Sequence, residues 1–247
     1  MIIRLFLFVF LATVYLFGLD FSFLFKDEKN NKYFLKKGLY YYYEEKNKGL
    51  ALEFFKKACE MNNSEACSYV GYIYQQMKPV DYNLATKFYN KSCNLGNGWG
   101  CNNLGAIAQN IYKNIEKAKQ YYYISCKLNY GLGCANLGYI FELKKQYDIA
   151  AKFYIKACKL DNALGCNNLG SFYARKEMYS KAIRYYEKSC KISDGLGSAL
   201  GCFNLAEFYE FGIEVKKNLT KAKRLYYKAC KLGNNESCKR YVSKFEK

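Results

Sequence analysis

The sequence predicts an all-α solenoid built from helical repeats, and three features of the cysteine pattern lead to this prediction. Twelve cysteines fall into six pairs, five of them eight residues apart and the sixth twelve apart. The pairs recur every 32 to 40 residues. A fixed short spacing inside a longer period indicates repeated units, each linked once to the next. The pairs are Cys59–Cys67, Cys93–Cys101, Cys126–Cys134, Cys158–Cys166, Cys190–Cys202 and Cys230–Cys238.

The residues before the first cysteine of each pair predict an amphipathic helix, which we call helix B. An alanine stands eight residues before the cysteine in every unit, and large apolar residues stand four and five residues before it. These offsets place them on one face of an α-helix. We therefore interpret the aromatic residues of helix B as core. The alanines are Ala51, Ala85, Ala118, Ala150, Ala182 and Ala222.

The residues after the second cysteine predict another amphipathic helix, helix A, with the cysteine in its first turn. Four residues after the cysteine stands Gly71, Gly105, Gly138 or Gly170, and Ala206 in the fifth case. Glycine inside a helix costs about 1 kcal/mol relative to alanine. Its return at one position indicates close approach of another backbone, most simply the alanine face of helix B.

Turns between B and the next A contain glycine or asparagine, which end helices in left-handed conformations. Residues 95–98 and 232–235 are examples. The whole pattern predicts six A–B units, the first near residues 32–62, and a final capping helix at 236–246. The longer spacing of Cys190–Cys202 adds four residues, which is about one helical turn. The two thiols can therefore still meet.

The N-terminus predicts an export signal over residues 1–22. Arg4 precedes an apolar run at 5–19, and Asp20 interrupts it. Fifteen apolar residues are short for a membrane span, which needs about 20. An uncleaved N-terminal anchor is the alternative, and only in that form do we expect membrane attachment. An even cysteine count fits export, because an oxidising compartment lets all six pairs form disulfides.

The absence of histidine narrows the possible chemistry. The chain has none among its 247 residues. Structural zinc is the competing interpretation of the cysteines, but zinc sites usually pair cysteines two to four residues apart. Eight-residue spacing without histidine fits zinc poorly, so we predict no metal and no cofactor.

The formal charge of +18 comes mainly from lysine, since only five of the 39 basic residues are arginine. Arginine is the residue of choice for bidentate phosphate contacts, so this surface is not a nucleic-acid signature. One interpretation is solvated helix faces that carry lysine. The other is affinity for an acidic partner, such as an envelope or host component.

One stretch resembles a known repeat family. Residues 204–212 read NLAEFYEFG, and Lys221-Ala222 and residues 226–233 (YYKACKLG) follow. This unit looks like a Sel1-like repeat, a relative of the tetratricopeptide repeat. The eight-residue cysteine staples resemble the Helicobacter cysteine-rich protein family in particular. The resemblance covers residues 32–247, although the fourth and fifth units have shorter A–B turns, as at 143–147, closer to tetratricopeptide length.

The resemblance implies a right-handed α-solenoid, secreted or periplasmic, and two kinds of function. One is protein or peptide binding, including contact with host cells. The other is penicillin binding with weak β-lactamase activity. Serine β-lactamases resemble one another in Ser-x-x-Lys, Ser-Asp-Asn and Lys-Thr-Gly motifs, and none of these occurs here. We therefore predict a binding scaffold, a monomer, with no catalytic residues and negligible β-lactam turnover.

A column of asparagines is the candidate binding site. Two residues after the second cysteine stand Asn103, Asn136, Asn168 and Asn204. An asparagine side chain both donates and accepts hydrogen bonds, so one per unit could bind the backbone of an extended peptide. At 100° per residue this position lies off the stripe that meets helix B. The alternatives are a structural ladder that joins successive A helices, or a genome bias towards asparagine.

Overall fold

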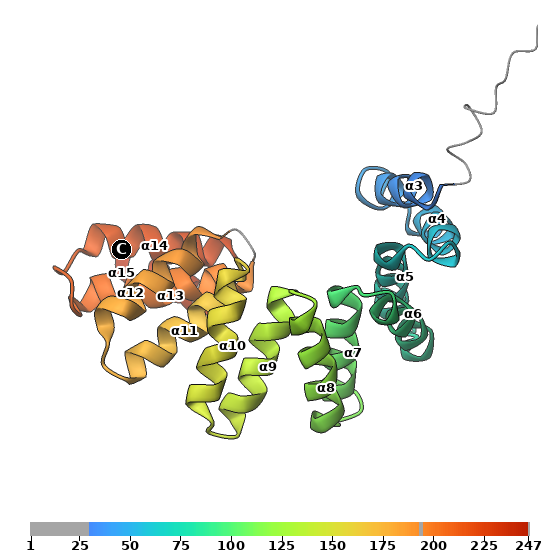
Figure 1. Ribbon diagram of the computed structural model, residues 1–247. Helices are drawn as coiled ribbons and strands as arrows, with labels where there is room; N and C mark the ends of the chain where they lie inside the picture. Colours follow the sequence, from blue (N-terminus) through green and yellow to red (C-terminus); the bar gives the residue numbers. More distant parts are fainter. Residues whose placement is uncertain (1–29, 193–194, 247) are drawn as a thin grey trace, which may run out of the picture.

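The computed structural model describes residues 30–192 and 195–246, which form thirteen helices and no strand. The helices, numbered as in Figure 1, alternate between the A and B types. The A helices are α3 (Asn31–Tyr43), α5 (Ser64–Gln76), α7 (Gly98–Asn110), α9 (Gly131–Leu143), α11 (Ala163–Arg175), α13 (Leu196–Phe211) and α15 (Asn235–Phe245). The B helices are α4 (Lys48–Glu60), α6 (Tyr82–Asn94), α8 (Ile115–Lys127), α10 (Tyr147–Lys159), α12 (Tyr179–Lys191) and α14 (Leu219–Lys231).

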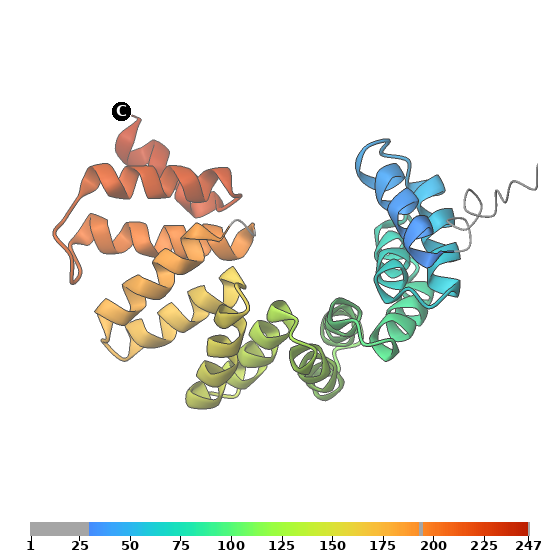
Figure 2. The ribbon, with the colours of Figure 1, turned by 45° about the horizontal axis from the view of Figure 1, so that its top comes forward.

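The helices stack in chain order into a curved array, whose two ends face each other across an opening (Figure 2). The predicted all-α, right-handed solenoid with disulfide staples is confirmed. The predicted export segment, residues 1–22, lies outside the described residues. Within the described ranges, no helix combines the length and the apolar character that crossing a bilayer requires.

Asparagine and glycine set the turns between units, as the pattern predicts. Asn62, Asn129, Gly96 and Gly233 all have positive φ angles, between 58° and 94°. Only short polar residues and glycine adopt this left-handed region readily, and it reverses the chain after a helix. The next residue in three of these turns is an asparagine, whose side chain accepts a hydrogen bond from a backbone N–H in the first turn of the following helix. These N-caps are Asn63, Asn97 and Asn234.

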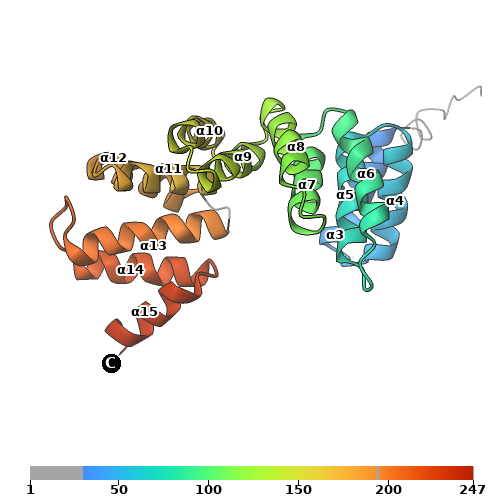
Figure 3. The same cartoon turned by 90° about the horizontal axis from the view of Figure 1, so that it is seen from below.

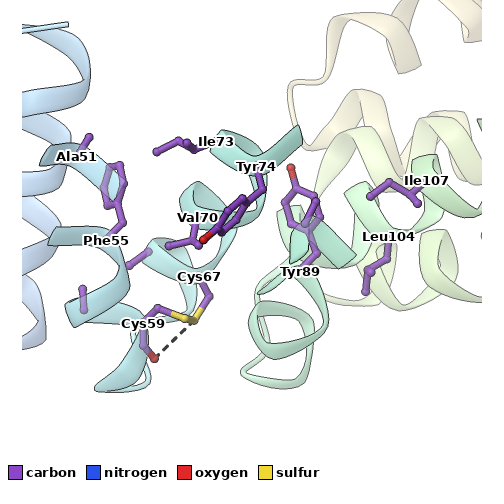
Figure 4. Close-up of a cluster of buried hydrophobic side chains, with 13 residues drawn as sticks. Ala51, Phe55, Cys59, Cys67, Val70, Ile73, Tyr74, Tyr89, Leu104 and Ile107 are labelled. Atoms are coloured by element: carbon purple, nitrogen blue, oxygen red, sulfur yellow. Dashed lines mark hydrogen bonds between the residues drawn. A yellow bond between two sulfur atoms is a disulfide. The ribbon is translucent and has the colours of Figure 1, made fainter. Parts of the chain in front are cut away.

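Six disulfides join the last turn of each B helix to the next A helix. The bonded pairs are Cys59–Cys67, Cys93–Cys101, Cys126–Cys134, Cys158–Cys166, Cys190–Cys202 and Cys230–Cys238, with Cα atoms 4.5–4.7 Å apart. Figure 4 shows the first of them between α4 and α5. The first five bonds lie within the core, since the second cysteine of each is fully buried, and the sixth is half-buried. They therefore fix the angle between consecutive units.

The longer spacing of the fifth pair is absorbed as an added helical turn. α13 has 16 residues where the other A helices before it have 13. The extra residues precede Cys202, which is consequently the seventh residue of its helix, whereas Cys166 is the fourth of α11. The Cα atoms of Cys190 and Cys202 remain 4.6 Å apart.

The core between A and B is a column of rings packed against glycines. Phe55, Tyr89, Tyr154 and Tyr226 are fully buried, and the first two are seen in Figure 4. This confirms the interpretation of the helix B aromatics as core. Each tyrosine hydroxyl also reaches a polar group on helix A: Tyr89 donates to Gln75 over 3.0 Å and Tyr154 to Glu142 over 2.6 Å.

The repeated glycine meets a ring, which corrects the expectation that it meets the alanine face. A Cβ built on Gly105 would lie 2.6 Å from the ring of Tyr122, and one on Gly71 would lie 2.8 Å from the ring of Tyr89. At Gly138 the backbone of the expected alanine also comes close, since the carbonyl oxygen of Ala150 would be 3.2 Å away. A flat ring lying across helix A needs the space that a side chain would fill.

A buried carboxylate anchors the capping helix α15, which spans Asn235–Phe245, one residue before the predicted range. Figure 3 shows α13, α14 and α15 packed side by side. Glu210 on α13 accepts a hydrogen bond from the Tyr226 hydroxyl over 2.6 Å and forms an ion pair with Lys244. Arg240 lies 3.3 Å from Glu207, whose pKa is raised by burial against the opposing effect of Arg240.

The buried tyrosines predict a loss of stability at alkaline pH. Burial raises the pKa of Tyr122 to about 12, and the pKa of Tyr226 likewise to about 12, from an ordinary value of 10.0. Between these values the unfolded chain releases protons that the folded chain retains, so the free energy of unfolding falls as pH rises. The stabilisation is complete below about pH 10 and is lost through about pH 12.

Urea unfolding at a series of pH values tests this expectation, with the ultraviolet absorbance of tyrosinate as a second signal. Tyr122→Phe removes one ionisable group and should make the alkaline slope shallower. A free energy of unfolding that stays constant from pH about 9 to about 12 would contradict the prediction.

Candidate functional site

The A helices form the inner layer of the array. Each A helix contacts the next, from α3 through to α13, in addition to the B helices beside it. No two B helices are packed comparably within the described ranges. In a curved array the layer with the closer spacing lies on the inside of the curve, so the B helices form the outer layer (Figure 2).

A stripe of each A helix faces away from the B helices. The residues at the cysteine and three, four and seven positions after it are buried against B; in α5 they are Cys67, Val70, Gly71 and Tyr74. At 100° per residue, positions −2, +2, +5 and +9 point to the opposite side. We call these positions of α5, α7, α9, α11 and α13 the inner stripe. The four predicted asparagines occupy position +2 in α7, α9, α11 and α13, and each is half-buried.

The asparagines are hydrogen-bonded along the array. The amide of Asn136 on α9 donates to the side chain of Asn102 on α7 over 2.9 Å. The amide of Asn204 on α13 donates to Asn167 on α11 over 2.8 Å. These bonds tie successive A helices together. An asparagine amide has two N–H donors and its carbonyl has two lone pairs, so one such bond leaves further capacity.

The other two asparagines bond within their own helices, and Asn168 also forms a hydrogen bond with the Tyr154 hydroxyl on α10. Asn103 donates to the carbonyl oxygen of Trp99 over 3.1 Å. Asn168 accepts from the amide of Asn167 over 3.2 Å. The four side chains are thus spaced one per unit along the inner stripe, with their polar groups partly engaged and partly exposed.

Lysine is absent from the inner stripe. Its charged residues are Glu65, Arg175 and Glu207, and Arg175 pairs with Glu142 over 2.7 Å. The lysines of the described residues therefore lie on helix faces and turns outside this stripe. The inner stripe presents amides, aromatic rings and aliphatic side chains to a partner.

Two adjoining hollows lie near the N-terminal ends of α5, α7, α9, α11 and α13, and Tyr43 at the C-terminal end of α3 borders the first. The first, of about 650 Å³, is lined by aromatic residues of α3, α5 and α7 and by Tyr130 before α9. The second, of about 620 Å³, is mainly aliphatic and includes Leu132, Leu164 and Leu196. Asn129 and Tyr130 border both hollows. The sequence reasoning missed this surface; its signal was the replacement of the column asparagine by Tyr69 in α5 and the one tryptophan of the chain at Trp99.

The first hollow contains a tyrosine whose pKa is perturbed. Burial raises the pKa of the Tyr69 phenol, with a hydrogen bond to Tyr43 as a further cause. Within residues 30–192 and 195–246, no three histidine, cysteine, aspartate or glutamate side chains gather as metal ligands would.

Models of known families match most of the array. The Sel1 repeat model matches residues 33–63, 64–97, 100–130 and 199–234. The tetratricopeptide repeat model matches residues 133–164 and 165–195. These two are the units with shortened A–B turns, so the predicted departure from the Sel1 pattern is confirmed.

Solved structures with the same architecture include several Sel1 repeat proteins. The protective antigen c5321 of uropathogenic Escherichia coli is 23% identical, with a TM-score of 0.68 over 90% of this chain and 50% of its own. This chain therefore spans half the length of that antigen. A Sel1 repeat protein from Oxalobacter formigenes is 20% identical, with a TM-score of 0.68 over 81% of this chain and 85% of its own.

The cysteine-rich protein B of Helicobacter pylori is 32% identical over 54% of this chain and 98% of its own, with a TM-score of 0.42. A sequence search of curated proteins found no match. The matched repeats cover more than half of the 247 residues, and their helices are those of the array described above. This chain belongs to the Sel1 repeat family.

Proposed function

We propose that this protein is an exported scaffold that binds an extended segment of a partner protein or peptide along its inner stripe. The observation that carries the proposal is the column of Asn103, Asn136, Asn168 and Asn204, one half-buried amide per unit on the exposed side of the inner layer. Sel1 repeats are in general protein-interaction modules. A series of donors and acceptors, one per unit, can bind amides at intervals along an extended chain.

Location in an oxidising compartment supports the same proposal. Six disulfides indicate an extracellular or periplasmic environment. Residues 1–22 would supply the export signal. The E. coli relative is described as a protective antigen. On this basis we also propose that this protein contacts host components. The lysine-rich outer surface would attract an acidic partner from a distance, an effect that weakens with salt.

The test compares two sets of variants that break the same hydrogen bonds from opposite sides. Replacing Asn103, Asn136, Asn168 and Asn204 with alanine removes the exposed amides. Asn102→Ala combined with Asn167→Ala removes the buried ends of the ladder and leaves the exposed column in place. The ligand is a peptide selected from a display library against the wild-type protein.

We expect the quadruple variant to weaken peptide binding about a hundredfold or more, because each lost hydrogen bond contributes about 1 kcal/mol. The buried-side double variant should bind within a few-fold of wild type. Calorimetry gives both affinities, and circular dichroism checks that each variant keeps its helical content. Equal losses in the two sets would show that the asparagines act only as a ladder, and an unchanged affinity in the quadruple variant would refute the assignment.

A further inference from the structure

The first hollow is an aromatic cage with one carboxylate. We call it the aromatic hollow and define it by Tyr43, Tyr69, Tyr72, Trp99, Tyr130 and Glu65. The ring centroids of Tyr69 and Trp99 are 5.0 Å apart and nearly perpendicular, and those of Tyr72 and Trp99 are 5.9 Å apart. Tyr69 is held in place from behind by stacking on the buried Phe55 at 4.6 Å. The cage is therefore built on a fixed ring.

The rings of the aromatic hollow carry no cation of the protein's own. Elsewhere in the described residues, lysine and arginine repeatedly lie over aromatic faces; Lys221 over Tyr209 at 3.9 Å and Lys176 over Phe172 at 4.6 Å are examples. None of these described pairs involves the five rings of the hollow. In a chain with 39 basic residues, no lysine or arginine lines this hollow.

Glu65 is also without a basic partner. It is exposed in the first turn of α5 and lies near enough to Tyr69 to raise the pKa of that phenol. None of the ion pairs or side-chain hydrogen bonds in the described ranges engages its carboxylate. A carboxylate in the first turn is favourable for the helix on its own account. The juxtaposition with aromatic rings that have no lysine or arginine over them is what points to a ligand.

We propose that the aromatic hollow binds the cationic end of a lysine or arginine side chain of the partner. Aromatic faces attract a cation through the ring quadrupole, and the attraction is greatest when the cation is partly desolvated and tryptophan is one of the rings. Glu65 would supply the counter-charge. This inference rests on the proposed function, because it adds a side-chain anchor to the peptide that the asparagine column would hold.

The placement suits an anchor at one end of the inner stripe. The hollow lies on α3, α5 and α7, and the asparagine column begins on α7 with Asn103, one turn after Trp99. A single basic side chain would enter the hollow, and the peptide backbone would continue along the asparagines. A partner that is acidic overall can still carry that one basic residue.

Trp99 provides the test, because it is the one tryptophan of the chain and its fluorescence reports on this site alone. The probes are the acetylated amides of lysine and arginine, with those of norleucine and citrulline as neutral matches of similar shape. We expect saturable changes in Trp99 fluorescence with the two cations. Equal responses to the neutral probes, or no saturable response to either cation, would overturn the proposal.

The matched variants are Glu65→Gln and Glu60→Gln. Each removes one exposed carboxylate near an end of a neighbouring helix, but only Glu65 lines the hollow. Glu65→Gln should weaken binding of the cationic probes fivefold or more, and Glu60→Gln should not change it. Equal affinities in these two variants would remove Glu65 from the site and refute the carboxylate's role.

The two proposals fail in distinguishable ways. The quadruple asparagine variant keeps the hollow intact and should bind the cationic probes as wild type does. Probe binding without any peptide binding would reject the scaffold proposal and keep the hollow. Peptide binding that depends on the asparagines, with no response to the cationic probes, would reject the hollow alone.

Discussion

Reduction of the six disulfides is expected to remove most or all of the stability of the folded protein. A crosslink that closes a loop of eight residues is worth about 2.5 kcal/mol in the chain-entropy model, and five of the six bonds have this separation. Six such bonds add about 15 kcal/mol if their effects are independent, compared with about 5–15 kcal/mol for the whole stability of a typical domain.

Thermal unfolding followed by circular dichroism, with and without a phosphine reductant, measures this effect. The matched comparison is the single-bond variant in which Cys126 and Cys134 are both alanine, which should lose about 2.5 kcal/mol. Thiol titration of the denatured, unreduced protein should find essentially no free thiol. A reduced protein that melts at the same temperature as the oxidised one would show that packing alone maintains the array.

Tyr154→Ala is expected to cost about 4 kcal/mol of unfolding free energy, the largest effect of a single substitution away from the cysteines. Its ring is fully buried between α9 and α10, so truncation leaves a cavity in addition to the lost burial. Its hydroxyl also donates to Glu142 over 2.6 Å. Tyr154→Phe keeps the ring and should lose about 1 kcal/mol, the usual contribution of one such hydrogen bond.

The glycine opposite this ring provides a stringent check. A Cβ at Gly138 would lie 2.6 Å from the Tyr154 ring, so Gly138→Ala should destabilise the wild type by about 1–3 kcal/mol. In the Tyr154→Ala background the ring is gone, and the same change should be neutral or favourable because alanine is the better helix former. Chemical denaturation of the four proteins gives the coupling energy. Additive effects would mean that the two residues do not meet.

The regular part of the fold was predictable because its determinants are local. The cysteines, the turn asparagines and the helix stripes repeat at fixed offsets. Each of these features acts on residues that are close to it in the sequence, within one or two helical turns. The end of the capping helix could be placed to within a residue for the same reason: the predicted range was 236–246 and α15 spans Asn235–Phe245.

The partner of the repeated glycine could not be read from spacing. Periodicity tells which face of a helix is buried, but not whether a backbone or a ring covers a given position. Gly71 and Gly105 were expected to meet the alanine face of helix B, and the atoms nearest to each belong to a tyrosine ring. The alanine and the tyrosine of helix B are four residues apart, about one turn, so they lie on the same face and the periodicity cannot separate them.

The candidate site was predictable in part. The asparagine column is visible as one residue type at one offset, and the sequence left a ladder and a groove as alternatives; the bond from Asn136 to Asn102 depends on the distance between helices that are 34 residues apart in sequence. The aromatic hollow left no repeated pattern in the sequence, only the two isolated departures at Tyr69 and Trp99. Tyr43, Tyr69 and Trp99 come from three successive A helices and stand at three different offsets, so no periodic signal marks them.

The pairing of each cysteine with the next one along the chain has a consequence for biogenesis. A polypeptide that is threaded through a translocation channel from its N-terminus releases its thiols in sequence order. An oxidase that joins each newly emerged thiol to the one just before it would therefore produce the native connectivity directly, starting with Cys59 and Cys67. The first competing partner of Cys67, Cys93, is 26 residues further on. Closing that longer loop costs about 1 kcal/mol more entropy than closing one of eight residues. Maturation of this array should consequently need no disulfide isomerase, however many units it contains.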